Sequence, residues 1–142
     1  MRILWMIPLF MLAVPDRPDP TPREERPPHE QIVSDWLYIG DTGTGAPKGV
    51  PVYVLRILAT ETIWMENNRP MAGNGFTATV TFDWTKKPVA IDFIQRGGGG
   101  RIPGILQLDG DRLILAWSND SNTRPTDFAS ARQVHHFTRV KK

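Results

Sequence analysis

Apolar and polar residues alternate most regularly between residues 76 and 82, where every second residue is apolar and each residue between is a threonine. Side chains of a β-strand point alternately to its two faces, so this pattern predicts a strand with one face in the core and one in water. Three later segments are rich in apolar residues and predict further strands: residues 89–95, 102–108 and 112–117. The second half of the chain therefore predicts consecutive antiparallel strands.

The connections within this half carry turn signals. Leu108-Asp109-Gly110-Asp111 is the clearest, since Asp-Gly tolerates the positive backbone angles that a tight two-residue hairpin imposes. Four consecutive glycines at residues 97–100 resemble part of a phosphate-binding loop. However, they lack the Lys and the Ser or Thr that complete such a loop, and no helical pattern follows. We interpret this run as a flexible hairpin tip.

The first half of the chain predicts less regular elements. A short helical turn is expected within residues 29–35, followed by a first strand at residues 36–39. The long segment 50–64, rich in β-branched and aromatic residues, is divided near Ala59 into two strands, and residues 133–140 predict a final strand. Glycine, proline and polar residues mark loops between these elements at residues 40–49, 67–75 and 119–126.

About eight strands with hardly any helix predict an all-β fold, in the form of a small antiparallel up-and-down β-barrel or a closed sandwich. Closure also explains why the sequence shows no long amphipathic helix that could cover an open sheet. The length of 142 residues fits one compact domain, since single domains cluster near roughly 100 to 150 residues. We expect the barrel domain to span residues 29–142.

Residues 1–14 are predicted to be a signal peptide or leader. Arg2 supplies a positive start, and residues 3–14 are apolar throughout apart from Pro8. This run is shorter than the roughly 20 residues that a membrane-spanning helix needs, so no transmembrane span is expected. A buried apolar strand and a mistaken start codon are the other interpretations. A functional leader would export the protein to the periplasm or the extracellular space.

Residues 15–28 contain six prolines among charged side chains. Each proline removes a backbone donor, and the low apolar content cannot offset the entropy of ordering the segment. The sequence therefore predicts a disordered linker that holds the barrel domain away from another structure.

The charge balance argues against nucleic-acid binding, because 17 basic and 15 acidic side chains leave a formal charge of only +2. The tail from Ala129 to Lys142 is locally basic, with Arg132, Arg139, Lys141 and Lys142 and no acidic residue, and we interpret it as a solvated strand end. The chain has no cysteine, which excludes disulfides, thiol catalysis, iron–sulfur clusters and lipidation on cysteine.

No pattern of residues predicts catalysis, a metal or a cofactor. His135 and His136 are adjacent, so on a strand they would face opposite sides and could not bind one metal together, and His29 is the remaining histidine. Asp92 lies within a predicted strand, on the face opposite its apolar neighbours. We expect it to form an outward salt bridge with a lysine or arginine of a neighbouring strand. The expected protein is not an enzyme and uses no cofactor.

Several short pieces follow one another in the second half of the chain: Lys87-Pro88, Ile91-Asp92, Gly104-Ile105, Leu108, Gly110-Asp111, Leu113, Leu115, Arg124-Pro125-Thr126 and Phe128. Their order and spacing, over about a third of the chain, resemble a family of uncharacterised bacterial domains that recurs in planctomycetes and looks like a lipocalin-type barrel. The resemblance implies a small exported barrel with no established activity.

The resemblance also implies how one end of the barrel closes. In such barrels a tryptophan of the first strand, two positions after a glycine, plugs that end; here Trp36 is present, but Ser34 stands where the glycine would be. A late arginine often packs across this tryptophan, and the resemblance assigns that role to Arg124. A stacked guanidinium there would stabilise the closed end by roughly 0.5 to 2 kcal/mol.

An eight-stranded barrel is just wide enough either to be filled by side chains or to hold one small ligand. Trp117 shares its strand face with Leu113 and Leu115, so it is expected to point inward. Our first hypothesis is an exported lipocalin-like barrel that binds a small hydrophobic molecule in an interior lined by Phe82, Phe93, Leu115 and Trp117.

The alternative is a filled barrel that serves as a structural or protein-interaction module at the cell envelope, with its basic last strand as the contact surface. The two hypotheses differ in the expected interior. A cavity of about 300 Å³ or more favours ligand binding, whereas a solid interior favours the module. The sequence names no protein partner.

Overall fold

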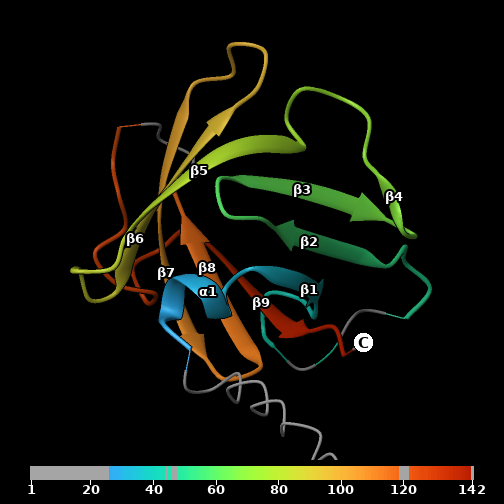
Figure 1. Ribbon diagram of the computed structural model, residues 1–142, viewed down its shortest axis with the longest axis horizontal. Helices are drawn as coiled ribbons and strands as arrows, with labels where there is room; N and C mark the ends of the chain where they lie inside the picture. The colour runs from blue at the N-terminus through green and yellow to red at the C-terminus, as the bar shows by residue number, and fades with distance from the viewer. Residues whose placement is uncertain (1–25, 44, 46–47, 119–121, 142) are drawn as a thin grey trace, which may run out of the picture.

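The computed structural model describes residues 26–43, 45, 48–118 and 122–141 (Figure 1). The predicted leader, residues 1–14, and the predicted linker up to residue 25 lie outside the described residues. The described elements are α1 (Pro28–Gln31), β1 (Ser34–Tyr38), β2 (Tyr53–Ile57), β3 (Glu61–Glu66), β4 (Arg69–Pro70), β5 (Thr77–Asp83), β6 (Val89–Gln95), β7 (Arg101–Asp109), β8 (Arg112–Trp117) and β9 (Gln133–Arg139).

Eight of these strands close into an antiparallel up-and-down β-barrel, which confirms the predicted fold class. The strands lie in the order β2-β1-β9-β8-β7-β6-β5-β3, and pairing of β2 with β3 completes the ring. The short β4 pairs with the end of β3 and extends the sheet beyond the barrel (Figure 1). Every strand of the barrel therefore has two neighbours, and no long edge is left open within it.

The strand boundaries follow the hydrophobic pattern closely. β6 and β8 have the predicted limits, β5 and β7 differ from theirs by one residue at each end, and β9 ends one residue earlier than predicted. The segment 50–64 divides into β2 and β3 around Ala59, as predicted. Two predictions were wrong in detail: the helical turn ends at Gln31, because β1 already begins at Ser34, and β4 was missed because Arg69-Pro70 lies in a segment with loop composition.

The two ends of the barrel differ in their connections. At the end that we call closed, neighbouring strands are joined by short turns at residues 58–60, 84–88 and 110–111, and α1 lies there. At the open end the connections span residues 39–52, 67–76, 96–100 and 118–132. The β6–β7 hairpin, whose tip is the predicted glycine run, projects from this end (Figure 1). The open end is therefore the one at which the interior can meet solvent.

Apolar side chains fill the interior toward the closed end. The largest fully buried residues are Trp36, Phe137, Ile32, Leu55, Ile57, Ile91, Leu106, Leu113 and Leu115. They come from strands on all sides of the ring, together with Ile32 from the segment between α1 and β1. Full burial of one such side chain stabilises the fold by roughly 1.5 to 3 kcal/mol, so this cluster is the main source of the barrel's stability.

Trp36 is fully buried near the closed end, where the resemblance places a plug, but the arginine that lies over it is not Arg124. The guanidinium of Arg139 lies 4.2 Å from the centroid of the Trp36 ring. Arg139 donates hydrogen bonds to the carboxylate of Asp111 at 2.9 Å and to the carbonyls of Gln31 and Gly110 at 2.8 and 3.0 Å. The indole N–H of Trp36 donates to the Ile32 carbonyl at 2.8 Å. The stacking prediction for Arg124 was therefore wrong.

The basic residues near the C-terminus differ in their exposure. Arg139 was predicted to belong to a solvated basic strand end, yet it is only 4% exposed, because its register on β9 places it against Trp36 of β1. Arg132 and Lys141 are exposed as predicted.

Among the described residues, no helix has the length and apolar character needed to cross a membrane.

Candidate functional site

A pocket of about 170 Å³ lies in the open half of the barrel. Side chains of β2, β3, β5, β6, β7 and β8 line it, together with two residues from the 67–76 connection. The lining residues are Leu55, Thr62, Trp64, Gly75, Phe76, Ala78, Phe93, Gln95, Ile102, Leu115 and Trp117. Most of this lining is aliphatic or aromatic, and Thr62 and Gln95 are its two residues with a hydroxyl or amide side chain.

The pocket has a buried floor and a mouth between two loops. Leu55 and Leu115, at 1% and 0% exposure, belong to the floor. At the mouth, the β6–β7 hairpin packs against the 67–76 connection: a Cβ placed on Gly97 would lie 2.5 Å from the Asn74 side chain. A side chain at this glycine would have to displace the Asn74 side chain. The glycine run thus lets the hairpin approach its neighbour closely at the pocket mouth.

Aromatic rings form a continuous series around this part of the interior. Neighbouring centroids lie 4.4 to 5.9 Å apart along the series Phe93, Trp117, His135, Tyr38, Phe137 and Trp64. These spacings are typical of favourable ring pairs, each contributing about 0.5 to 1.5 kcal/mol beyond burial. The two ends of the series, and Trp117 within it, line the pocket. The pocket wall is therefore held by ring contacts that extend into the core.

His135 and Tyr38 are titratable residues within this ring series. The His135 ring stacks on Trp117, and its Nδ1 lies 3.0 Å from Oδ1 of Asp41, which accepts a hydrogen bond from the Tyr38 hydroxyl at 2.6 Å. The histidine and carboxylate are close but not aligned as a hydrogen bond, so Asp41 acts on the ring through its charge. Burial lowers the pKa of His135 from 6.5, and the Asp41 charge opposes this only in part. The pKa of Tyr38 is raised to about 12, mainly because the hydroxyl is buried and further because it donates a hydrogen bond to the negatively charged Asp41.

The lowered pKa of His135 predicts a loss of stability in mild acid. The unfolded chain takes up a proton at this histidine near pH 6.5, whereas the folded protein resists it, so the free energy of unfolding should fall as the pH drops below about 6.5. His135→Phe, which can keep the stacking on Trp117, should remove this part of the pH dependence. Urea unfolding from about pH 7.5 to pH 5 measures it.

The exposed His29, in α1, provides the matched control. His29→Gln removes a histidine whose side chain is exposed, so any change that it causes is the background against which His135→Phe is compared. A slope that persisted undiminished in His135→Phe would contradict the assignment. The carboxylates with lowered pKa values, Asp83, Asp92 and Asp127, lose their stabilising contribution only in more acidic solution, below about pH 4, so the two effects are separable.

The structure brings together three of the four residues predicted to line the interior. Phe93, Leu115 and Trp117 lie in the pocket lining. Phe82 points into the barrel but lies nearer the closed end, where its ring stacks on Trp84 at 5.4 Å. Phe82 is therefore not part of the pocket, because two further interior positions of β5, Ala78 and Val80, separate it from the mouth.

Sequence reasoning missed several lining residues, chiefly Leu55, Thr62 and Trp64. Thr62 and Trp64 are two residues apart on β3, which is the spacing of side chains on one face of a strand. That spacing could have placed Thr62 beside Trp64 inside the barrel. The residues of the 67–76 connection carried no comparable signal, because loop positions have no regular period.

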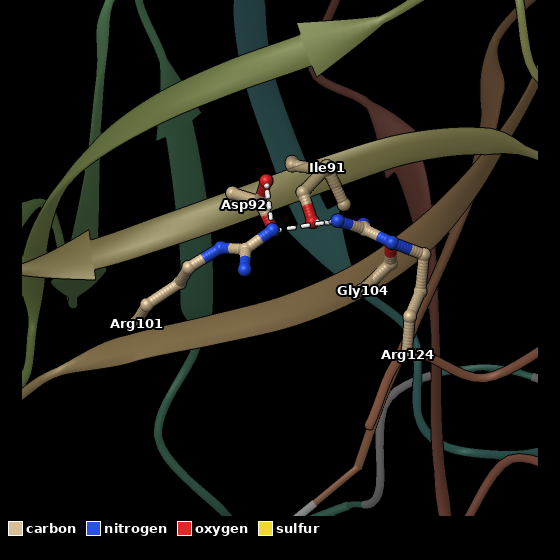
Figure 2. Close-up of polar contacts among 5 residues, drawn as sticks. All are labelled: Ile91, Asp92, Arg101, Gly104 and Arg124. Atoms are coloured by element: carbon tan, nitrogen blue, oxygen red, sulfur yellow. Dashed lines mark hydrogen bonds and ion pairs between the residues drawn. The ribbon is translucent and has the colours of Figure 1, made fainter. Parts of the chain in front are cut away.

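Arg124 holds the long β8–β9 connection to the outer face of β6 and β7. It donates hydrogen bonds to the carbonyls of Ile91 and Gly104 and to the Asp92 carboxylate at 2.7 Å. Arg101 donates to the other Asp92 oxygen at 2.8 Å. Figure 2 shows the two guanidinium groups approaching Asp92 from opposite sides. The outward salt bridge predicted for Asp92 is confirmed, with two arginines instead of one.

This cluster unites pieces of the sequence pattern that are far apart along the chain: Ile91-Asp92, Gly104 and Arg124 (Figure 2). Burial alone raises the pKa of Asp92, but the hydrogen bonds and charges of Arg101 and Arg124 outweigh it, so this pKa lies below its usual value. Arg124 thus acts by tying the connection to the barrel wall, and its hydrogen-bonding groups face the β6–β7 backbone.

Histidines and carboxylates do not gather into a metal site in the part of the chain that the structure describes. There, no group of three or more His, Cys, Asp or Glu residues could hold a metal ion. The two histidines of β9 have different surroundings. His135 stacks on Trp117, whereas His136 lies against the connection between β1 and β2, where a Cβ on Gly43 would lie 3.0 Å from its Nδ1.

Comparison of the chain with models of protein families, with curated proteins and with solved structures gives no match. The resemblance of residues 87–128 to a planctomycete-recurrent domain family therefore stays a prediction.

Proposed function

We propose that this protein is a non-enzymatic, exported carrier that binds one small, planar, mainly apolar molecule in the open-end pocket. The observation that supports the proposal most directly is the pocket itself, which has a buried apolar floor and an opening toward the loops of the open end. Burial of apolar surface would supply the affinity, at roughly 25 cal/mol for each Å² removed from water.

The size of the pocket narrows the class of ligand. Its volume of about 170 Å³ does not reach the roughly 300 Å³ that we expected of a ligand-binding interior and at which pockets for drug-sized ligands begin, although the interior is not solid. An apolar cavity of about 150 Å³ is known to take up benzene. The pocket therefore suits a molecule of about one aromatic ring and its substituents, and it is too small for a long lipid chain.

The shape of the lining favours a planar molecule. Trp64, Phe93 and Trp117 present rings from three different strands, and their partners in the ring series hold them in place. Ring pairs prefer offset or edge-to-face contact, which a flat aromatic guest can make with more than one wall. A preformed wall also reduces the entropy lost on binding.

Export is the part of the proposal that concerns residues outside the described structure. It is supported by the positive start and the apolar run of residues 1–14. A carrier at the envelope would hold its ligand on a barrel spaced from that leader by the proline-rich segment.

An NMR titration of the full chain with toluene tests the carrier function. The indole N–H signals of Trp64 and Trp117 should shift saturably, because both rings line the pocket. Ala78→Leu adds three carbons to the lining and should weaken toluene binding at least about tenfold by occupying the space. Native mass spectrometry before and after organic extraction would identify any ligand that is retained from the cell.

The matched control is Thr79→Leu, which adds a leucine at the neighbouring exposed position of the same strand. It should bind toluene like the unchanged chain. Absence of a saturable shift, together with absence of an extractable mass, would contradict the carrier function and leave the interaction module as the better account.

One observation favours that second function. Val33, Leu58 and Val140 are each more than a third exposed, and they line one depression at the closed end, around the Asp35–Arg56 ion pair. Apolar surface rimmed by charge is typical of protein-interaction sites. The contact surface of such a module would be this depression and not the basic face expected for the last strand, because Arg139 is buried.

A further inference from the structure

Thr62 is a polar residue at a position where an apolar one would fill the same space. It lies on β3 opposite Ala78 of β5 and Ile57 of β2, and only 2% of its surface is exposed. Valine has nearly the same shape and would avoid the cost of placing a hydroxyl among apolar side chains. A buried hydroxyl is favourable only when it has a hydrogen-bonding partner.

The pocket is the space that this residue lines. Thr62 contributes to its wall together with Leu55, Trp64 and Leu115, so a group bound there would meet the threonine between aliphatic and aromatic surfaces. In these surroundings a hydrogen bond is stronger than in water, and an unmatched polar group is more costly. A ligand with a complementary polar group would therefore be favoured at this wall over one without.

Gln95 supplies the second polar group of the lining, at the mouth. A Cβ placed on Gly75 would lie 3.7 Å from the amide nitrogen of Gln95, and one placed on Gly99 would overlap the amide oxygen. The amide thus lies between the 67–76 connection and the β6–β7 hairpin. Thr62 is thus the polar group of the buried wall, and Gln95 is the polar group of the mouth. The aromatic side chains of the lining remain free to contact the ring of a ligand.

From this arrangement we infer that the pocket selects a small aromatic molecule carrying a hydroxyl group, with Thr62 as the specificity-determining residue. The hydroxyl of a phenol can donate to or accept from the Thr62 Oγ1, while the ring contacts Trp64, Phe93 and Trp117. Gln95 serves a second polar substituent that reaches the mouth. This inference rests on the proposed carrier function and names its ligand class.

Phenol and toluene provide the test, because they have almost the same size and differ in the hydroxyl. Both are titrated into the full chain and into the Thr62→Val and Thr62→Ser variants, with the indole N–H signals of Trp64 and Trp117 as the readout. Thr62→Val should weaken phenol at least about fivefold, which corresponds to one hydrogen bond, and leave toluene unchanged or tighter. Thr62→Ser keeps the hydroxyl and should retain most of the phenol affinity.

The outcomes separate the two proposals. If toluene binds to the unchanged chain but Thr62→Val alters phenol and toluene affinity equally, the carrier function stands and the hydroxyl specificity is overturned. If neither probe binds to the unchanged chain, the carrier function itself fails and the inference fails with it. Thermal unfolding of each variant, with midpoints close to that of the unchanged chain, shows that differences in binding do not come from loss of the fold.

Discussion

Replacing Arg139 with alanine is expected to lower the free energy of unfolding by about 2 to 3 kcal/mol, because it removes the charged donor of three hydrogen bonds and the group that packs over Trp36. The side chain is 4% exposed, lies over Trp36, and donates to Asp111 and to two backbone carbonyls. The Gln31 and Gly110 carbonyls would lose this donor. Asp111 is itself half exposed, so its share is reduced by water.

Urea unfolding with a fluorescence readout measures the effect. Arg139→Lys should recover only part of the loss, because a single ammonium cannot reach three acceptors and stack on an indole as a planar guanidinium does. Arg132→Ala, which changes an exposed arginine just before the same strand, should stay within about 0.5 kcal/mol of the unchanged chain. An Arg139→Ala effect as small as that of Arg132→Ala would show that the network does not hold the closed end.

Gly104→Ala is expected to cost about 2 to 3 kcal/mol, near the upper end for overpacking a core. The added Cβ would lie 2.8 Å from the Ala116 carbonyl oxygen and 3.2 Å from a methyl group of Ile91. The first contact is with backbone of the neighbouring strand, which cannot move without disturbing the β7–β8 pairing. Any shift of β7 would also disturb the Gly104 carbonyl, which accepts a hydrogen bond from Arg124.

The comparison for this prediction is Gly75→Ala, since a Cβ there would meet its nearest neighbour at an ordinary 3.7 Å. Gly75→Ala should change the unfolding free energy by less than about 0.5 kcal/mol. Chemical denaturation of both variants measures the difference. Equal stability of the two would mean that β7 and β8 accommodate a methyl group between them, contrary to the packing described above.

The arrangement of strands was predictable where the sequence has a regular period. In β5, a threonine at every second position leaves only one face that can enter the core, so the pattern specifies both the strand and its orientation. β6 and β8 were equally clear because turn residues bound them. β4 could not be found in this way, because its two residues are a continuation of the pairing of β3 and have no period of their own.

The arginine at the closed end shows what a linear pattern leaves open. Arg124 and Arg139 both follow β8, and the resemblance suggested that one late arginine would pack on Trp36. Pairing of Trp36 with Arg139 across β1 and β9 decides which of the two lies there. Arg124 belongs instead to a connection that crosses the outside of β6 and β7.

Of the residues that were predicted to line the interior, the linear pattern placed three correctly and one incorrectly. Phe93, Leu115 and Trp117 were predicted from their positions on inward faces, and they line the pocket. Phe82 met the same criterion yet lies outside the pocket, because period shows which face a side chain occupies but not its height along the barrel. Height depends on the stagger between neighbouring strands, and stagger is set by how the ring closes.

By itself, the sequence determined that this chain forms an antiparallel all-β fold and which face of each regular strand is buried, because alternation and turn residues act over a few neighbouring positions; pairing of β2 with β3 then decided for the barrel over the closed sandwich. Only the tertiary structure decided that Arg139 covers Trp36, that Asp92 lies between two arginines and that Thr62 enters the wall of a pocket. Each of these contacts joins residues from separate strands or loops, and barrel closure is what brings them together.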